Sequence, residues 1–284
     1  PLPLQGKIEA MRKLSWLIVI GWVALLASCT PNNVKTDEKL GKYFEEAGVT
    51  GSFALFDNGI GEFTVYDVAK FKDSLYTPAS TFKIINSLIA LETGRINNEK
   101  DVLPWDGVQR ENTDWNQDLS LEKAFELSAV PHFQTLALRI GKDTMQSWLD
   151  TLGYAAKENR FVINNNLSSF WLDQSAKVCG DEQLGIVKRL YFGQLPFQKR
   201  TQDIVRKMML RESNSNYTLA YKTGLGKTPQ GQPMTWVVGW IEENKHPYFF
   251  VLHLEGKDET ALVNQRLNIL KNILTYLNFF EGKR

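Results

Sequence analysis

The hydrophobic and polar positions of the chain form two groups of strand-like segments on either side of a long helical stretch. In the first group, residues 51–56 and 62–66 flank Asp57-Asn58-Gly59, a sequence typical of a tight hairpin turn. In the second group, which follows Asn216, aromatic and β-branched residues predict three strands. These strands are expected at residues 217–222, 235–242 and 248–255, followed by a closing helix at residues 262–279.

Between the two groups, from about residue 80 to residue 203, apolar residues recur at helical spacing. The first run follows Ser80 and stops at Gly94. Further helices are expected at residues 120–127, 133–140, 144–152, 182–192 and 198–209. This order predicts an α+β fold, in which both chain ends form an antiparallel sheet flanked by helices and an all-helical lobe is inserted between them. Because no linker separates these parts, we expect one domain over residues 47–284.

The N-terminal region has the pattern of an export signal. Residues 1–10 show no clear pattern and are interpreted as upstream translated sequence or a cloning remnant. Two basic residues then precede an apolar run that is about as long as the hydrophobic part of a signal peptide. The run ends in Leu26-Ala27-Ser28-Cys29, which resembles the bacterial lipobox, so residues 11–28 are expected to be a lipoprotein signal peptide. Residues 29–46 are expected to be a lipidated Cys29 and a tether, which anchors the protein to a membrane facing the periplasm or the cell exterior.

Composition and charge exclude several classes of function. The chain has 284 residues, 33 Lys+Arg and 32 Asp+Glu, and 43% of its residues are hydrophobic, which excludes general disorder. Its net charge of +1, without a long basic run, does not suggest a nucleic-acid partner. The three histidines are scattered, so no metal site is expected and a Ser-His-Asp mechanism is disfavoured. Besides Cys29, the only cysteine is Cys179, which is expected to be a buried core residue.

The chemistry of the chain is expected to begin at Ser80-Thr81-Phe82-Lys83. A serine at a helix start lies near backbone N–H groups that favour developing negative charge, and a lysine three residues later can reach its hydroxyl. Such a lysine can act as, or carry, the base that activates the serine. Ser120-Leu121-Glu122-Lys123 has the same spacing, but there we expect only a helix cap by Ser120.

Two further motifs distinguish Ser80 from Ser120. Ser128-Ala129-Val130 follows in the helical region, and Lys222-Thr223-Gly224 ends a predicted strand. The three motifs in this order resemble those of the penicillin-recognising serine enzymes. Val130 makes the resemblance more specific, because many relatives of other classes have Asn at this position, which can hydrogen-bond the motif lysine.

Within that superfamily, the chain resembles the class D, oxacillinase-type, β-lactamases over nearly all of residues 50–280. Besides the three motifs, stretches typical of this class occur at residues 104–107, 115–118, 170–172, 195–197 and 236–240. The resemblance implies hydrolysis of β-lactam antibiotics through an acyl-enzyme on Ser80, with CO2 bound covalently to Lys83 as a carbamate. Burial beside Val130 and Phe82 is expected to lower the pKa of Lys83 and supply the neutral amine that reacts with CO2.

The resemblance also implies roles for other residues. Trp171 would donate its indole N–H to the carbamate, and Ser128 would relay a proton to the leaving nitrogen. The oxyanion would be held by the backbone N–H groups of Ser80 and Leu225. The substrate, including its carboxylate, would be bound by Lys222, Thr223, Gly224 and Arg266, and the approach of water would be lined by Val130 and Leu172.

One departure and two alternatives remain open at this point. The class generally has an aromatic-Gly-Asn motif, and its best counterpart is Leu152-Gly153-Tyr154, which retains only the glycine. One alternative function is a β-lactam-sensing module that is acylated without turnover; the other is a D,D-peptidase. The range of β-lactams hydrolysed and the oligomeric state do not follow from the sequence.

Overall fold

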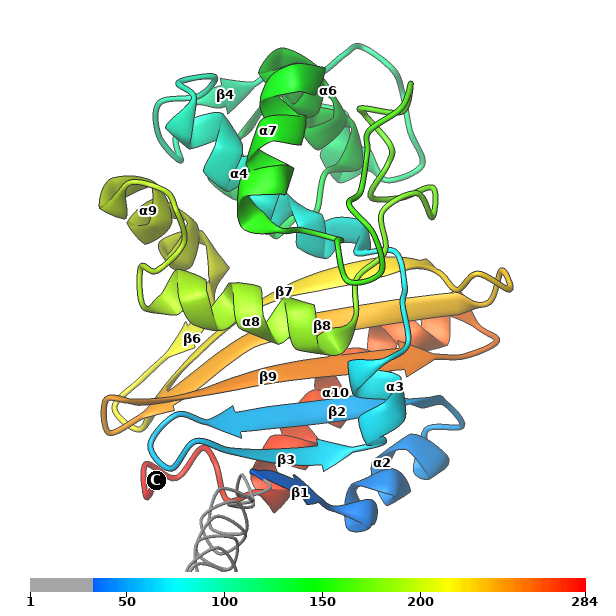
Figure 1. The fold of residues 1–284 in the computed structure, drawn as a ribbon, viewed down its shortest axis with the longest axis vertical. Coiled ribbons are helices and arrows are strands. Elements are labelled where there is room, and N and C mark those ends of the chain that lie inside the picture. Colours follow the sequence, from blue (N-terminus) through cyan, green and yellow to red (C-terminus); the bar gives the residue numbers. More distant parts are fainter. Residues whose placement is uncertain (1–32) are drawn as a thin grey trace, which may run out of the picture. The chain divides into compact units, whose positions relative to one another are not determined.

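A computed structural model describes residues 33–284, and its ribbon is shown in Figure 1. The central sheet has seven strands in the order β1-β3-β2-β9-β8-β7-β6. Its strands are β1 (Val34–Thr36), β2 (Thr50–Asp57), β3 (Glu62–Tyr66), β6 (Leu210–Ser213), β7 (Tyr217–Lys227), β8 (Pro233–Glu243) and β9 (His246–Glu255). The expected antiparallel sheet built from both chain ends is confirmed, because β2 pairs antiparallel with both β3 and β9.

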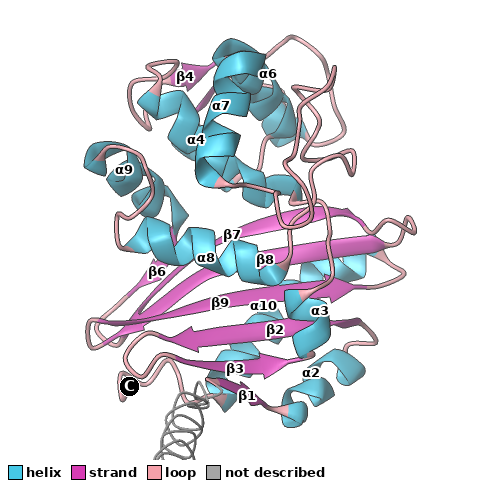
Figure 2. Ribbon diagram, viewed as in Figure 1, coloured by secondary structure: helices cyan, strands magenta, loops and turns pink. Residues whose placement is uncertain are grey.

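The helices divide between the sheet and an inserted lobe. The inserted lobe contains α4 (Lys83–Glu92), α5 (Leu121–Glu126), α6 (Val130–Ile140), α7 (Lys142–Leu152) and α9 (Lys199–Met209), together with the short pair β4 (Val102–Leu103) and β5 (Leu119–Ser120). The sheet is accompanied by α2 (Gly41–Glu46), α3 (Val68–Lys72), α8 (Gly180–Tyr191) and α10 (Glu259–Tyr276). Figure 2 shows the helices of the lobe gathered beyond the β7 side of the sheet. The predicted all-helical lobe is thus confirmed except for this small pair of strands.

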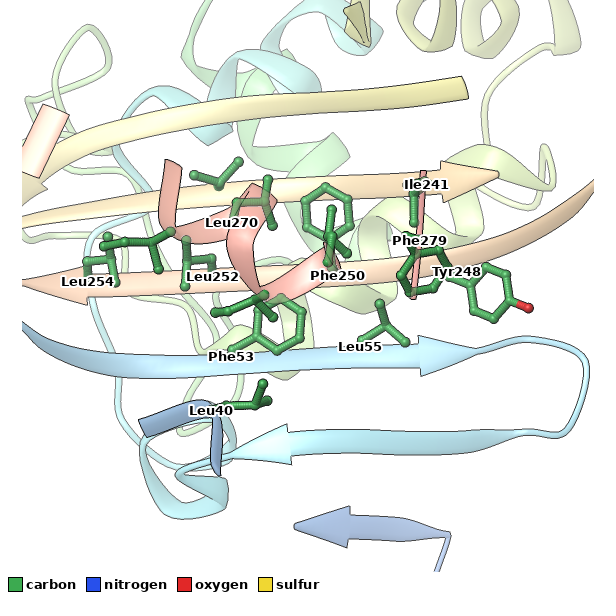
Figure 3. Packing of buried hydrophobic residues seen from close by; sticks show 14 of the residues in the cluster. Leu40, Phe53, Leu55, Ile241, Tyr248, Phe250, Leu252, Leu254, Leu270 and Phe279 are labelled. Carbon is green, nitrogen blue, oxygen red and sulfur yellow. The ribbon is translucent and has the colours of Figure 1, made fainter. Parts of the chain in front are cut away.

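The main hydrophobic core lies between the sheet and α10, as Figure 3 shows. Alternate residues of the central strands, such as Phe53 and Phe250, point to this face and meet Leu270 of α10. On the other face of the sheet α8 packs against β8 and β9. Within the described residues, every helix is too short or too polar to traverse a lipid bilayer.

The structure corrects the expected tether at residues 29–46. Residues 34–46 are folded, because they form β1, a 3-10 turn at Glu38–Leu40 and α2. Leu40 and Phe44 are 0% and 1% exposed and belong to the main core, which a solvated tether would not allow. Most charged residues of residues 34–46 are exposed, and they explain the tether-like composition of the segment. The segments expected as an upstream remnant (1–10), a signal peptide (11–28) and a lipidated Cys29 lie outside the described residues.

Candidate active site

The site begins at a strained turn before the first helix of the lobe. Ala79, the residue preceding Ser80, has a φ of 51°, which is unfavourable for a residue with a side chain. Ser80 follows in the 3-10 turn Ala79–Phe82, which leads directly into α4. The turn places the Ser80 hydroxyl 2.7 Å from Nζ of Lys83, which donates to it. The expected pairing of serine and lysine is present.

Lys83 is buried completely, at 0% exposure. Its Nζ lies 5.3 Å from the centre of the Phe133 ring, and burial lowers the pKa of Lys83 to about 7. At neutral pH a large fraction of this amine is therefore uncharged. A neutral amine can accept a proton or react with an electrophile, which an ammonium group cannot do.

Ser128 lies across the site, in the link between α5 and α6. Its φ of 52° is a second strained backbone angle at the site. Lys222 of β7 donates from Nζ to the Ser128 hydroxyl at 2.5 Å and to the Thr223 carbonyl at 3.0 Å. Burial, and next the positive charge of Lys83, hold the pKa of Lys222 well below its usual value. Lys222 therefore donates a short hydrogen bond to Ser128 and can stabilise negative charge on the Ser128 oxygen.

These residues border a cavity of about 270 Å³. Its walls are formed by Ser80, Asn112, Trp115, Ser128, Val130, Thr223, Leu225, Val263 and Arg266. The structure thus brings most of the predicted site residues together. The predicted residues that are not part of these walls are Lys83, Trp171, Leu172, Lys222 and Gly224. Lys83 meets the cavity through its hydrogen bond to Ser80, and Lys222 through its bond to Ser128. Asn112 and Val263 were not among the predicted site residues. Trp115 belongs to residues 115–118, one of the stretches that the sequence analysis described as typical of the class.

One wall of the cavity is the free edge of β7. The pairing of β6 with β7 ends at Ala220, so the outer edge beyond it has no strand partner within the described residues. Thr223 and Leu225 lie on this stretch and line the cavity. An extended ligand can therefore pair with the backbone of β7. Gly224 contributes through its lack of a side chain. A Cβ there would lie 3.1 Å from the Pro78 carbonyl oxygen, so a glycine at this position lets β7 approach the Ser80 turn.

Arg266 brings a positive charge to the same cavity from α10. Its Nη1 donates to the Thr235 hydroxyl at 3.3 Å, while its buried Nε has no hydrogen-bond partner in the described part of the chain. Burial lowers the pKa of Arg266, although an arginine stays charged near neutrality. A carboxylate in the cavity would compensate this charge.

Trp171 is fully buried beside the Ser80 turn. Its indole stacks on Phe82 at 5.1 Å between ring centres and meets Phe170 edge-on at 5.0 Å. The indole Nε1 is buried and has no hydrogen-bond partner among residues 33–284. A buried donor in this state is unfavourable and is available to an acceptor that reaches it.

Three other expectations concern residues around the site. Ser120 caps α5 by accepting the backbone N–H of Lys123 at 3.2 Å, so its interpretation as a cap is confirmed. Cys179 is buried, as expected, at the start of α8, and burial raises the pKa of its thiol. Gly153 ends α7 in the left-handed conformation, and Tyr154 packs its ring 5.6 Å from Phe82. An aromatic ring, that of Tyr154, therefore packs beside the Ser80 turn, although Leu152-Gly153-Tyr154 retains only the glycine of the aromatic-Gly-Asn motif.

Comparisons with known proteins agree with this geometry. Residues 45–275 match the model of the penicillin binding protein transpeptidase domain. The chain is 37% identical to probable beta-lactamase YbxI of Bacillus subtilis over 78% of this chain and 80% of that protein. It is 33% identical to beta-lactamase OXA-10 of Pseudomonas aeruginosa over 91% and 92%, respectively. The crystal structure of the class D beta-lactamase YbXI from Nostoc superposes with a TM-score of 0.80 and 33% identity, over 86% of this chain and 100% of that one.

Proposed function

The chain belongs to the penicillin-binding transpeptidase family and, within it, to the class D β-lactamases, and from this premise we propose how its residues hydrolyse β-lactam antibiotics. The observation that carries the proposal is the pairing of Ser80 Oγ with Nζ of a buried Lys83 at 2.7 Å. The resulting enzyme is a serine hydrolase that forms an acyl-enzyme on Ser80.

The base is proposed to be Lys83 carboxylated by CO2. Three features of the site fit this group: a buried amine, the absence of a carboxylate partner for that amine among the hydrogen bonds of the described residues, and the unpaired indole N–H of Trp171. When bound, CO2 supplies a carboxylate in a position where the chain itself has none. Trp171 would donate to that carboxylate and so satisfy its own buried N–H.

Acylation follows from the positions of the remaining groups. Ser80 loses its proton toward Lys83, and its oxygen attacks the β-lactam carbonyl carbon. The backbone N–H groups of Ser80 and Leu225 would stabilise the oxyanion. Ser128 gives its proton to the ring nitrogen as the C–N bond breaks and takes up in return the proton that left Ser80, which frees the base at Lys83 for the next step. Lys222 stabilises the Ser128 oxygen during this relay through the bond described above. Arg266 and Thr223 would hold the substrate carboxylate.

Deacylation returns Ser80 to its starting state. A water molecule loses a proton toward the base at Lys83, attacks the ester carbonyl, and releases the product acid while Ser80 regains its proton. Val130 lines the cavity, and Leu172 follows Trp171 directly, so both are proposed to border the path of this water. A hydrocarbon side chain at position 130 offers the base no competing hydrogen bond.

A time course with a chromogenic cephalosporin tests the function. We expect many products per enzyme molecule, and loss of turnover in Ser80→Ala. Release of one equivalent followed by arrest would instead indicate a β-lactam sensor or a transpeptidase. Hydrolysis of D-alanyl-D-alanine peptides without turnover of β-lactams would indicate a D,D-peptidase.

Export and anchoring are proposed separately, from the lipobox-like sequence ending at Cys29. We expect the mature protein to enter the detergent phase of a Triton X-114 partition and to incorporate labelled palmitate. Cys29→Ser should abolish both. Partition of the parent chain into the aqueous phase would contradict the anchor without affecting the assignment of the active site.

A further inference from the structure

Thr77 lies three residues before Ser80 and is completely buried, at 0% exposure. Its hydroxyl donates to the backbone carbonyl of Trp171 at 2.7 Å. A buried threonine hydroxyl can donate its hydrogen bond to any of several neighbouring acceptors. Here it is directed to the backbone of Trp171, whose indole N–H has no hydrogen-bond partner among the described residues.

This bond belongs to a junction between two segments that are distant in sequence. The Trp171 carbonyl also accepts the backbone N–H of Ala79 at 2.9 Å. The Thr77 carbonyl accepts from the indole Nε1 of Trp236 in β8 at 3.1 Å, which holds Thr77 against the sheet. Backbone bonds between Tyr76 and Val178, of 3.0 and 2.8 Å, close the junction at its other end. The segment that carries the nucleophile and the segment that carries Trp171 are therefore joined through Thr77.

The ring contacts of Trp171 do not replace this bond. Stacking on Phe82 and the edge contact with Phe170 restrain the plane of the indole, but aromatic contacts tolerate sliding within the plane. A hydrogen bond to a carboxylate is more sensitive to the position of its donor. The backbone of Trp171 must then be fixed for the N–H to stay at one position.

We propose that Thr77 is a positioning residue, whose hydroxyl fixes Trp171 so that the indole N–H meets the carboxylate on Lys83. The inference rests on the proposed carboxylation of Lys83. It assigns Thr77 no contact with substrate. Its effect is on how firmly CO2 is retained, since the carbamate forms and decomposes reversibly and its stability depends on the bonds that it accepts.

The test compares three variants of the full chain. Thr77→Val keeps the shape of the side chain and removes the hydroxyl, and Thr77→Ser keeps the hydroxyl. Thr93→Val is the matched control, because the Thr93 hydroxyl also donates to a backbone carbonyl at 2.7 Å, that of Ile89, which likewise accepts a backbone N–H. Each valine variant thus loses a hydroxyl bond of the same length and leaves a carbonyl that still has a partner, and the two sites differ in that Thr77 is buried and Thr93 is partly buried.

The readouts are the bicarbonate concentration that gives half-maximal activity and the 13C NMR signal of the carbamate in 13C-bicarbonate. We expect Thr77→Val to need about fivefold more bicarbonate, the effect of one lost hydrogen bond, and to regain most of its activity at saturation. Thr77→Ser and Thr93→Val should behave as the parent does. A Thr77→Val variant with the parent's bicarbonate dependence and carbamate signal would overturn the role of Thr77.

A failure of the proposed carboxylation of Lys83 would give a different result in the same experiment. If the parent chain itself gave no carbamate signal and no response to bicarbonate, the carboxylation of Lys83 would be refuted, and the role of Thr77 with it. If Thr93→Val shifted the bicarbonate dependence as much as Thr77→Val, the effect would be a general loss of stability and the specific role of Thr77 would be refuted.

Discussion

Lys83 and Lys222 set the electrostatics of the site at the scale of single residues. Both are buried, and each is close enough that a charge on Lys83 contributes to the lowered pKa of Lys222. Two ammonium groups in so small a volume are unfavourable. Converting Lys83 to an anion reverses its effect on Lys222 and allows Lys222 to stay charged beside Ser128. The carboxylation proposed for Lys83 would thus remove the repulsion between the two ammonium groups and give Lys222 a neighbour of opposite charge.

The pKa of Lys83 leads to a pH prediction. Only the neutral amine reacts with CO2, and protonation removes it as the pH falls through the lowered pKa of about 7. At a fixed concentration of dissolved CO2, activity should therefore decline on acidification. The concentration of CO2 needed for half-maximal activity should rise more steeply below about pH 7 than above it. Steady-state rates at several CO2 concentrations between pH 5.5 and 8.5 measure this; a dependence of constant slope throughout would contradict the lowered pKa.

Ala155 provides a prediction about stability. It follows Tyr154 and has a φ of 55°, in the region where a side chain is unfavourable by about 1–2 kcal/mol. Ala155→Gly should remove this strain and, after the greater entropy of the unfolded chain is allowed for, raise the free energy of unfolding by about 0.5–1 kcal/mol. Urea unfolding measures the change. The neighbouring Ala156, which does not have a positive φ, is the control: Ala156→Gly should lower stability, and a stabilisation of equal size there would remove strain as the explanation.

At the scale of elements, the site depends on how closely β7 packs against the Ser80 turn. Gly224 faces the Pro78 carbonyl oxygen and the Thr81 side chain, which would lie 3.1 and 3.2 Å from an added Cβ. The strand edge that receives substrate and the turn that carries the nucleophile are therefore held together by the absence of a side chain. A shift of either element changes the distance between the proposed oxyanion donors.

Gly224→Ala should consequently affect both catalysis and folding. We expect a loss of about 1–2 kcal/mol of stability from overpacking and a decrease of kcat/KM of at least about tenfold, since small displacements of reacting groups are costly. Gly185→Ala in α8 is the matched control. A Cβ there meets nothing within 4 Å, so stability should rise by up to about 1 kcal/mol with unchanged kcat/KM. Full activity in Gly224→Ala would show that the close approach is not required.

The elements with a clear apolar period were predicted from the sequence, and those without one were not. The hairpin of β2 and β3 is confirmed, with Asp57 paired to Glu62 across the expected turn. The short β1 and β6 were missed because three or four residues do not establish a period. Ser80, Lys83 and Ser128 could be predicted because their order along the chain is characteristic. Asn112 and Val263 could not, since only the packing of distant loops and helices brings them to the cavity.

At the scale of the whole molecule, the core joins the start of the described chain to its last helix. Phe44 of α2 packs on Tyr66 of β3 at 4.7 Å and lies in the same cluster as Leu270 of α10. The segment expected as a tether is therefore part of the stabilising core. Its removal would expose the parts of β2 and α10 that α2 contacts.

Phe44→Ala tests this contribution. Loss of a buried phenylalanine side chain should lower the free energy of unfolding by about 3–5 kcal/mol, as measured by chemical denaturation of the mature domain. Leu138→Ala provides the comparison, because Leu138 is 60% exposed and should change stability by no more than about 0.5 kcal/mol. Equal, small effects of the two changes would support the tether instead.

The pairing of β2 with β9 has a consequence for how the chain is made. Thr50 pairs with Glu255 and Asp57 with Tyr248, so β2 must wait for a partner that is about 190 residues further along. At ribosomal speeds of roughly 5–20 residues per second, this strand is without that partner for on the order of 10–40 s. During this interval its apolar residues are open to aggregation or to binding by a chaperone. The same long-range pairing that builds the central sheet thus leaves β2 without its partner strand while the rest of the chain is being made.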